Sequence, residues 1–269
     1  MKNNAPLTGQ EAYIAAHKRH HRIITSWRFL LFAGFLLLWE LSSYFGWIDS
    51  FFFSSPSGTI HCLIDLLLNQ NLAWHISITS LETLASFFLV FLISIVIATI
   101  LWYFETLSEI LEPCLVILNS LPKSALAPLF IVWLGTGIPT IIVAGISVAV
   151  FGSIISFYTA FRQAEPEKIT LIYTLSGTKK DAFTKVVLPG SIPILLSTTK
   201  VNIGLSLVGV IIGEFLAARR GLGYLIIYGS QVFQLDMVIT SIIILCLMAF
   251  GLYKAVQFTE YKIKSLMKL

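Results

Sequence analysis

Six long apolar runs divide this chain, and each run is continuous rather than alternating between apolar and polar residues. A helix needs about 20 mainly apolar residues to cross the hydrocarbon core of a bilayer, whereas membrane strands alternate along their length. The pattern therefore predicts an all-α integral membrane protein with six transmembrane helices. The predicted spans are residues 27–47, 76–103, 110–133, 138–161, 192–216 and 237–256.

The third run is the one that leaves the count open, because it contains both Pro122 and Pro128. Proline removes a backbone hydrogen bond and bends or breaks a helix, so a count that splits or merges this run is the alternative. An odd number of spans would place one charged terminus outside the cytoplasm, against the charge bias, so we prefer six spans. The six-span count divides the chain into an N-terminal segment 1–25, a transmembrane domain 26–258 with its core at about 72–258, and a C-terminal tail 259–269.

The connection after the first run predicts a short helix at the membrane surface, over residues 56–68. Ser55 is placed to cap this helix, and Pro56 occupies the first helical position, where its missing N–H costs nothing. The connection from residue 48 to residue 75 carries no lysine or arginine.

The distribution of lysine and arginine predicts the orientation, since cytoplasmic segments of membrane proteins carry the excess of both. With six spans, three basic segments fall on one side, which we assign to the cytoplasm, and the two chain ends lie there. Arg219 and Arg220 are the exception, because they follow the fifth run on the outer side. The basic residues of the three segments are Lys2, Lys18, Arg19, Arg22 and Arg28, then Arg162, Lys168, Lys179, Lys180 and Lys185, then Lys254, Lys262, Lys264 and Lys268.

Composition agrees with this interpretation. The chain is 57% hydrophobic and 12% charged, about half of the roughly 25% charge that soluble domains carry. The net charge of +4 is not gathered in a patch with interleaved aromatic residues, which argues against nucleic acid as a partner. Cys62, Cys114 and Cys246 each lie in an apolar stretch without metal-ligand spacing, so we expect them to be small buried packing residues.

The polar loop at residues 162–190 predicts two short helices with an elbow between them. Pro166 suits the first position of one helix, and Gly177 suits its end. A second helix would start at about Lys179 and stop before Pro189. The pattern favours equally a compact cytoplasmic knob and an ordinary connecting loop.

Four motifs, in order along the chain, resemble the permease subunits of ATP-binding-cassette (ABC) importers, in the nitrate, sulfonate and taurine branch. They are Ser55-Pro56-Ser57, residues 121–137 with Leu-Pro-Lys and Trp-Leu-Gly-Thr-Gly, residues 174–189 ending in Leu-Pro, and residues 213–224 with Gly-Glu-Phe-Leu and Gly-Leu-Gly-Tyr. The resemblance covers nearly the whole chain beyond the N-terminal tail. It implies the type I importer architecture, in which the polar loop is the coupling loop that docks on a separate ATPase.

The resemblance also implies the partners. They are two ABC ATPase subunits that bind ATP and Mg, a second permease copy as a homodimer, an extracytoplasmic solute-binding protein, and the lipid of a prokaryotic cell membrane. The chain contains no Gly-x-x-x-x-Gly-Lys-Ser/Thr phosphate cradle, so it is not itself an enzyme and is expected to bind no cofactor. The solute implied is small and anionic, such as an aliphatic sulfonate, taurine or nitrate. The alternatives are a vitamin precursor or another small organic solute, and, for the whole protein, an ion-coupled secondary transporter.

The loop departs from the family pattern at two positions. The family motif begins Glu-Ala-Ala, where this chain has Thr170, Leu171 and Ile172, and it has glycine where this chain has Ser176. A charge contact from Thr170 is therefore not expected, while the adjacent Gly177 can still form the elbow. The residues that the resemblance assigns to ATPase coupling are Thr170, Tyr173, Ser176, Gly177, Lys179, Phe183, Leu188 and Pro189.

Charged and irregular positions inside the spans are candidates for the translocation path, because charge at membrane depth is costly and irregular backbone there lines cavities or is buried. The candidates are Pro122, Lys123, Pro128, Lys200 and Asn202. The alternative for Lys123 is a partner on a neighbouring helix, either a carboxylate or a carbonyl, or a side chain that reaches the interface. The alternative for Lys200 is a stem that reaches the cytoplasmic interface.

Span five carries two further expectations. Gly209 and Gly213 form a small-residue stripe, which allows close helix packing, either within one subunit or at a seam between two permeases. At the outer end, Glu214 with Arg219 or Arg220 would form a latch or meet the binding protein. The alternative is a surface ion pair of little energetic value.

Overall fold

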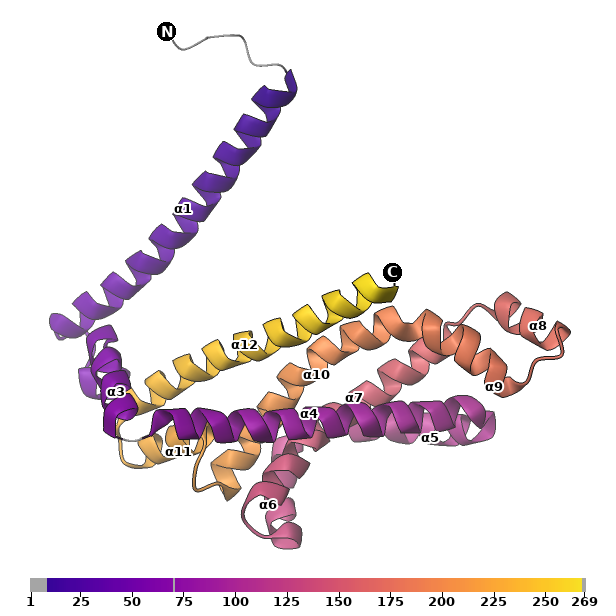
Figure 1. Cartoon of the computed structure of the whole chain (residues 1–269). Helices are drawn as coiled ribbons and strands as arrows, with labels where there is room; N and C mark the ends of the chain where they lie inside the picture. Colours follow the sequence, from indigo (N-terminus) through magenta and orange to yellow (C-terminus); the bar gives the residue numbers. More distant parts are fainter. Residues whose placement is uncertain (1–8, 70, 268–269) are drawn as a thin grey trace.

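The computed structural model describes residues 9–69 and 71–267, and all regular elements in those ranges are helices (Figure 1). Lys2 and Lys268, two of the charges used for the orientation, lie outside the described residues. The elements are α1 (Gly9–Tyr44), α2 (Ser50–Phe53), α3 (Pro56–Asn69), α4 (Leu72–Tyr103), α5 (Glu105–Ser120), α6 (Lys123–Leu134), α7 (Ile138–Arg162), α8 (Pro166–Thr174), α9 (Lys179–Ala182), the π-helix η1 (Phe183–Val187), α10 (Leu188–Ala217), α11 (Leu222–Gln231) and α12 (Leu235–Met267).

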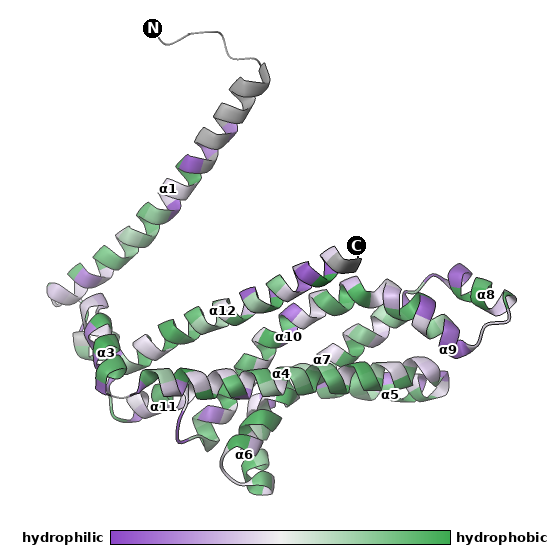
Figure 2. Ribbon diagram, in the orientation of Figure 1, coloured by the Kyte–Doolittle hydropathy of each residue, from purple (hydrophilic) through white to green (hydrophobic). Residues whose placement is uncertain are grey.

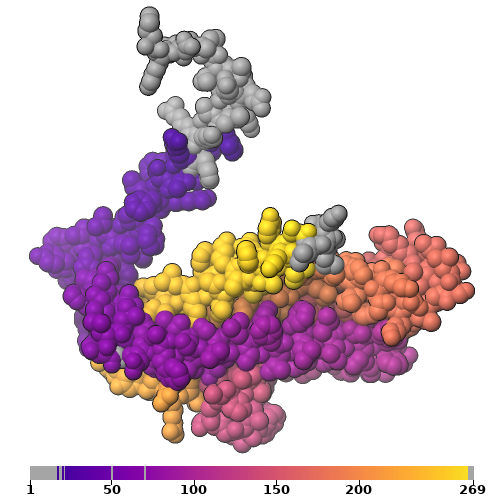
Figure 3. Space-filling model, in the orientation of Figure 1, coloured from indigo at the N-terminus to yellow at the C-terminus, as the bar shows by residue number. Residues whose placement is uncertain are grey.

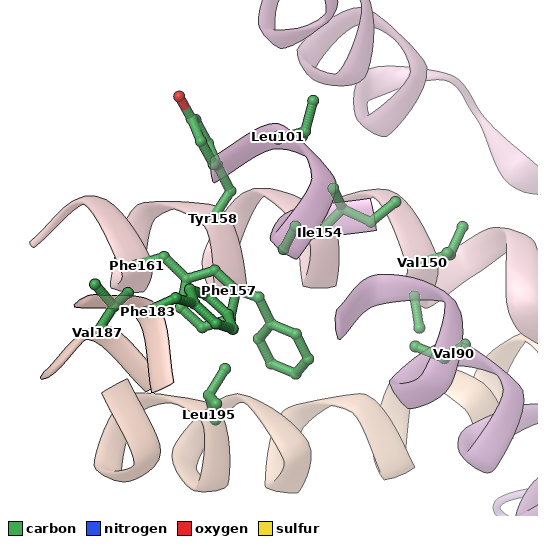
Figure 4. Close-up of a cluster of buried hydrophobic side chains, with 12 residues drawn as sticks. Val90, Leu101, Val150, Ile154, Phe157, Tyr158, Phe161, Phe183, Val187 and Leu195 are labelled. Atoms are coloured by element: carbon green, nitrogen blue, oxygen red, sulfur yellow. The ribbon is translucent and has the colours of Figure 1, made fainter. Parts of the chain in front are cut away.

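Helix α7 is the centre of the bundle, because it packs along both α4 and α10. The largest cluster of buried apolar side chains lies between these three helices and η1, and it includes Val90, Phe157, Phe161 and Val187 (Figure 4). A second cluster closes the opposite end of the bundle, where α3, α4, α11 and α12 meet. The long helices are apolar along most of their length, and polar residues gather at α8, α9 and the end of α12 (Figure 2).

Helix α1 stands apart from the bundle and approaches it only at its C-terminal end, where it contacts α3 (Figures 1 and 3). There Glu40 Oε2 accepts a hydrogen bond of 3.1 Å from the Ser57 N–H, at the positive N-terminus of α3. None of the apolar stretch of α1 is buried within this chain. Its outward apolar side chains are suited to lipid or to another protein helix.

Five helical segments of the described chain are long and apolar enough to cross a membrane: 22–44, 72–103, 138–162, 179–217 and 235–265. A sixth span exists only if α5 and α6 are counted together, since the chain bends by 95° between them. The predicted multi-span, all-helical fold is confirmed. The boundaries proposed at residues 25 and 258 both fall inside helices.

The expected continuous third span is wrong, and Pro122 is the reason. Leu121 precedes proline and takes an extended conformation, with φ −64° and ψ 139°, as steric contact with the proline ring favours. The helix therefore ends at Ser120 and restarts at Lys123. Pro128 lies inside α6 without ending it.

Of two other predicted helices, the one that begins at Pro56 is confirmed, and the one predicted to stop before Pro189 continues past it. Helix α3 confirms the helix predicted over residues 56–68, and Ser55 Oγ caps it by accepting the Gly58 N–H at 3.0 Å. The second short helix of the polar loop does not stop before Pro189, because α9, η1 and α10 form one uninterrupted helical segment. The wide turn of η1, in which the Leu188 N–H bonds to the Phe183 carbonyl, directly precedes the proline.

The expectation that the three cysteines are buried is wrong for two of them. No cluster of three or more metal-ligating side chains occurs among the residues that were placed. Cys114 and Cys246 are nevertheless exposed on the isolated chain, while Cys62 is half-buried. Cys62 packs against the buried cluster where α3, α4, α11 and α12 meet.

The glycine stripe of α10 is a packing surface within this chain. A Cβ on Gly209 would lie 2.7 Å from both the Ala144 carbonyl oxygen and the Gly145 Cα of α7, and a Cβ on Gly213 would lie 2.8 Å from the Ile141 Cα. Small residues of this kind let helices approach closely in a membrane. The alternative of packing inside one subunit is therefore the one that the structure supports for Gly209 and Gly213.

We expect Gly209→Ala to lower the free energy of unfolding by about 1–3 kcal/mol, as overpacking typically does, because α7 backbone blocks the added methyl group. Gly204→Ala on the same helix is the matched control, since nothing lies within 4 Å of a Cβ there and alanine favours helix. Thermal unfolding of the detergent-solubilised protein measures both. Equal stability of the two variants would contradict the close α7–α10 contact.

Candidate functional site

The polar loop forms a compact knob at one end of the bundle, built from α8 and α9 with the connection between them (Figure 1). Pro166 opens α8 as expected. No residue of α8 is buried, and Leu171, Tyr173 and Leu175 expose 57%, 46% and 72% of their surface. Apolar side chains gathered on a polar surface mark a site of protein contact. The knob interpretation, rather than an ordinary loop, is the one that the structure supports.

The elbow after α8 is made by Ser176 and not by Gly177. Ser176 is the left-handed residue, with φ +60°, and it stands where the family pattern has glycine. Gly177 contributes in another way, because a Cβ there would lie 2.5 Å from Ile172 Cγ2 and 2.7 Å from the Ile172 carbonyl oxygen. Its N–H bonds to that same carbonyl at 2.8 Å. Glycine is thus needed at 177 for a close approach, while the turn itself is strained at 176.

A capping box that sequence reasoning missed starts α9. The Asp181 N–H donates to Thr178 Oγ1 at 3.3 Å, and the Thr178 N–H donates to Asp181 Oδ2 at 2.9 Å. The Thr-x-x-Asp spacing of residues 178–181 was the available signal, since a capping box reads this way from sequence. Thr170 makes no charge contact, and its hydroxyl donates to the Pro166 carbonyl of its own helix at 2.9 Å.

The knob is fastened to the end of α4 by two residues that are one helical turn apart. The Lys179 ammonium donates to the Tyr103 carbonyl at 2.7 Å and lies 5.5 Å from the centre of the Trp102 ring. The Phe183 ring centre lies 5.1 Å from that of Trp102 and 5.3 Å from that of Phe161, within the cluster of Figure 4. Leu188 packs against this cluster; Pro189 is exposed.

At the other end of α10, Glu214 has no exposed surface and belongs to a buried polar junction. Its Oε1 accepts from the Thr79 hydroxyl of α4 at 2.7 Å, and its Oε2 accepts from the Gly223 N–H at 2.5 Å. The Leu222 N–H donates to Thr79 Oγ1 at 2.8 Å. A carboxylate at these N–H groups suits the positive end of α11. Glu82 of α4 is buried as well, and its Oε2 has no hydrogen-bond partner within the described chain.

The expected latch between Glu214 and an arginine is therefore wrong. Arg219 and Arg220 are exposed, and within the described chain the ion pairs of the structure include neither of them. The glycines of the Gly-Leu-Gly-Tyr motif explain the geometry instead. A Cβ on Gly221 would lie 2.4 Å from Glu214 Oε1, and a Cβ on Gly223 would lie 2.8 Å from Glu214 Cβ. Helix α11, which was not expected, is held by this junction.

The three polar path candidates, Lys123, Lys200 and Asn202, all have partners inside this chain. The Lys123 ammonium donates to the carbonyls of Leu118 and Asn119, the latter at 3.1 Å, and so caps the end of α5 at the break. This is the carbonyl-pairing alternative. The other two candidates lie on α10, where Lys200 pairs with Glu260 of α12 at 2.9 Å.

Asn202, the remaining candidate, is buried and donates to Ser153 Oγ at 2.8 Å. This bond joins α10 to α7, so the amide is used for packing between the two helices. Lys123 also contacts α7, since its ammonium lies 5.3 Å from the centre of the Phe151 ring, whereas Lys200 is paired with α12. Pro122 and Pro128 belong to the broken pair of helices.

Comparison with known proteins places this geometry among transport proteins. Residues 90–258 match the family described as "Binding-protein-dependent transport system inner membrane component". A "Probable ABC transporter permease protein" of Haemophilus influenzae is 28% identical over 87% of this chain and 95% of its own length. The "Putative aliphatic sulfonates transport permease protein SsuC" of Escherichia coli is 26% identical over 80% of this chain and 82% of its own.

Two further similarities bear on fold and on solute. The "Formylaminopyrimidine transport permease protein ThiX" of Halalkalibacterium halodurans is 27% identical over 72% of this chain and 77% of its own length. A permease chain in a structure titled "Inward facing conformations of the MetNI methionine ABC transporter" superposes with a TM-score of 0.60, at 16% identity, over 73% of this chain and 99% of that one. This last likeness shows a shared fold.

We expect Ser176→Gly to raise the free energy of unfolding by up to about 1 kcal/mol, because glycine adopts the left-handed conformation without the steric cost that serine bears. Ser176→Val should lower stability, since a β-branched residue is a clear outlier there. Ser77→Gly, in the exposed face of α4, is the control and should be destabilising. Thermal unfolding decides the matter, and a loss of stability in Ser176→Gly would show that Ser176 is not the elbow.

Proposed function

Because the chain belongs to the family of binding-protein-dependent inner membrane transport components, we propose that it forms the solute path of an ABC importer and couples to a separate ATPase through the α8–α9 knob. The observation that carries this proposal is the knob itself. It projects from a membrane bundle and exposes Leu171, Tyr173 and Leu175. It is also fastened to the transmembrane core through Lys179 and Phe183. A surface of this kind has no use in a chain that works alone.

The energy source lies in the partner. The sequence contains no Gly-x-x-x-x-Gly-Lys-Ser/Thr phosphate cradle, so two ATPase subunits would bind ATP and Mg and drive alternating access. A rigid docking element transmits rigid-body motion of such subunits into the membrane. A second copy of this chain would complete the path, and the exposed apolar faces of the described helices supply surface for it. An ion-coupled transporter would need coupling carboxylates open to the path, whereas Glu214 is fully buried.

The orientation follows from charge. The knob carries Lys168, Lys179 and Lys180, and Lys185 follows it in η1, so the knob belongs in the cytoplasm by the positive-inside rule, together with both chain ends. The turn that holds Arg219 and Arg220 then lies outside, where an extracytoplasmic solute-binding protein would meet it. Both arginines are exposed and are available for that contact.

For the solute we propose a small anionic organic molecule, with an aliphatic sulfonate as the first candidate. The match to a permease named for aliphatic sulfonates supports it. A vitamin precursor is the second candidate, since a formylaminopyrimidine permease matches over a comparable share of the chain. Lys123 would attract an anion only by leaving the α5 carbonyls that it now caps, so its role is tied to movement of the α5–α6 break.

The test is to purify the chain with the ATPase and binding protein encoded beside it and to measure ATP hydrolysis in proteoliposomes with each candidate solute. Gly177→Val should keep the fold but lose stimulated hydrolysis, because the valine side chain collides with Ile172 and displaces the knob. Gly251→Val on α12 is the control, since a Cβ there meets nothing within 4 Å. A chain that purifies alone and transports without ATP would refute the proposal.

A further inference from the structure

A single helical segment runs from the knob to the opposite end of the bundle. It comprises α9, η1 and α10, from Lys179 to Ala217, and is 39 residues long. At about 1.5 Å per residue this is a rod of roughly 58 Å. We refer to it as the coupling rod. Helix α4 runs beside it and contacts it, so the two long elements can be compared end by end.

At the knob end, α4 is tied to the rod by the bond from Lys179 to the Tyr103 carbonyl. Tyr103 is the last residue of α4, so its carbonyl has no partner within the helix and carries the negative end of the helix dipole. A lysine is the favoured partner at such a place. The ammonium also lies over Trp102, and Phe183 packs on the same ring.

At the far end, α4 is tied to the rod by Glu214. The Thr79 hydroxyl of α4 donates to Glu214 and at the same time accepts the Leu222 N–H of α11. Glu214 accepts from Gly223 as well. Three elements therefore meet at one carboxylate, and the exposed turn with Arg219 and Arg220 lies between the rod and α11.

Directional bonds at both ends matter because apolar packing in lipid does not fix the position of one helix along another. Lipid tails are as apolar as the side chains, so there is no hydrophobic drive that holds one register. The buried bonds of Glu214 hold one register, since an unpaired partner there would be costly. At the exposed knob end, the Lys179 bond acts together with the packing of Phe183 on Trp102. With a bond at each end, α4 and the rod cannot slide or splay independently.

We propose that α4 and the coupling rod move as one rigid frame, in which Lys179 and Glu214 are the positioning residues that carry a displacement of the knob to the outer turn 218–224. The inference rests on the proposed function and adds to it the route of coupling inside this chain. Helices α5 and α6 are joined through the 95° bend, which Lys123 secures locally. We place this pair outside the frame, although α5 contacts α4 and α6 contacts α10. The frame thus moves against the α5–α6 pair.

The test uses the complete complex in proteoliposomes and compares ATP hydrolysis with and without solute-loaded binding protein. Lys179→Met should lower the stimulation by binding protein by about tenfold, a size consistent with losing one hydrogen bond to a charged group. Lys254→Met is the matched control, since that ammonium contacts Gln257 at 3.0 Å and the Phe250 ring, both on its own helix. Lys179→Arg should restore most of the stimulation, because a guanidinium can donate to the same carbonyl and stack on Trp102.

The second tie gives an independent arm. Glu214→Gln keeps the size of the side chain but replaces one acceptor oxygen with an N–H₂ donor. Either the Thr79 hydroxyl or the Gly223 N–H then loses its acceptor. The same loss of stimulation is expected, although the change lies at the opposite end of the rod. Stimulation at the wild-type level in Lys179→Met would overturn the frame. So would a Lys179→Met complex that fails to assemble while Lys179→Arg assembles, since Lys179 would then act in docking.

Failure of the proposed function is recognised separately. In that case the wild-type chain would neither retain an ATPase nor respond to a binding protein, whatever the variants do. A wild-type complex that responds, together with variants that respond equally, rejects the frame alone.

Discussion

A hydrocarbon solvent offers no hydrogen bonds, so each backbone polar group that this chain carries into the membrane must be matched by another part of the chain. The break between α5 and α6 frees carbonyls at the end of α5, and the Lys123 ammonium takes them up. The N-terminus of α11 presents unpaired N–H groups, and Glu214 together with Thr79 accepts them. Charges that look functional in the sequence are therefore first of all partners for interrupted backbone.

The same constraint explains why the knob is part of the bundle. The aromatic cluster that buries Phe157 and Phe161 includes Phe183 and Val187 of η1 (Figure 4). The helix that leaves the knob is thus anchored in the largest apolar core before it crosses the membrane. The exposed face of α8, by contrast, contacts nothing within the described chain that buries it. Anchored on one side and open on the other, the knob has the form of a transmission element.

Much of the fold is readable from the sequence, because continuous apolar runs and the positions of lysine and arginine are set by the solvent alone. The runs at 76–103 and 138–161 agree with α4 and α7 within a few residues. The surface helix at Pro56 and the opening of α8 at Pro166 follow from the conformational limits of proline. These are local rules that need no knowledge of neighbours.

The remainder depends on contacts between distant residues, which no local pattern contains. Glu214 was expected to pair with the nearby Arg219 or Arg220, but it bonds to Thr79, 135 residues away. Gly177 was expected to form the elbow because glycine adopts positive φ, yet Ser176 has that conformation. Glycine is required at 177 because Ile172 lies too close to leave room for a side chain. The continuity of α9 into α10 across Pro189 was missed because the wide turn of η1 precedes the proline.

The central claim is that the exposed face of α8 is the contact for an ATPase, and site-directed cross-linking in native membranes tests it most directly. In a chain whose Cys62, Cys114 and Cys246 are replaced by serine, a single cysteine at Tyr173 would be treated with a thiol-reactive cross-linker and the products identified by mass spectrometry. A cysteine at Thr106, exposed at the start of α5, is the comparison. The account predicts a product that joins Tyr173→Cys to an ATPase subunit and none from Thr106→Cys; equal cross-linking from both positions, or none from Tyr173→Cys, would contradict it.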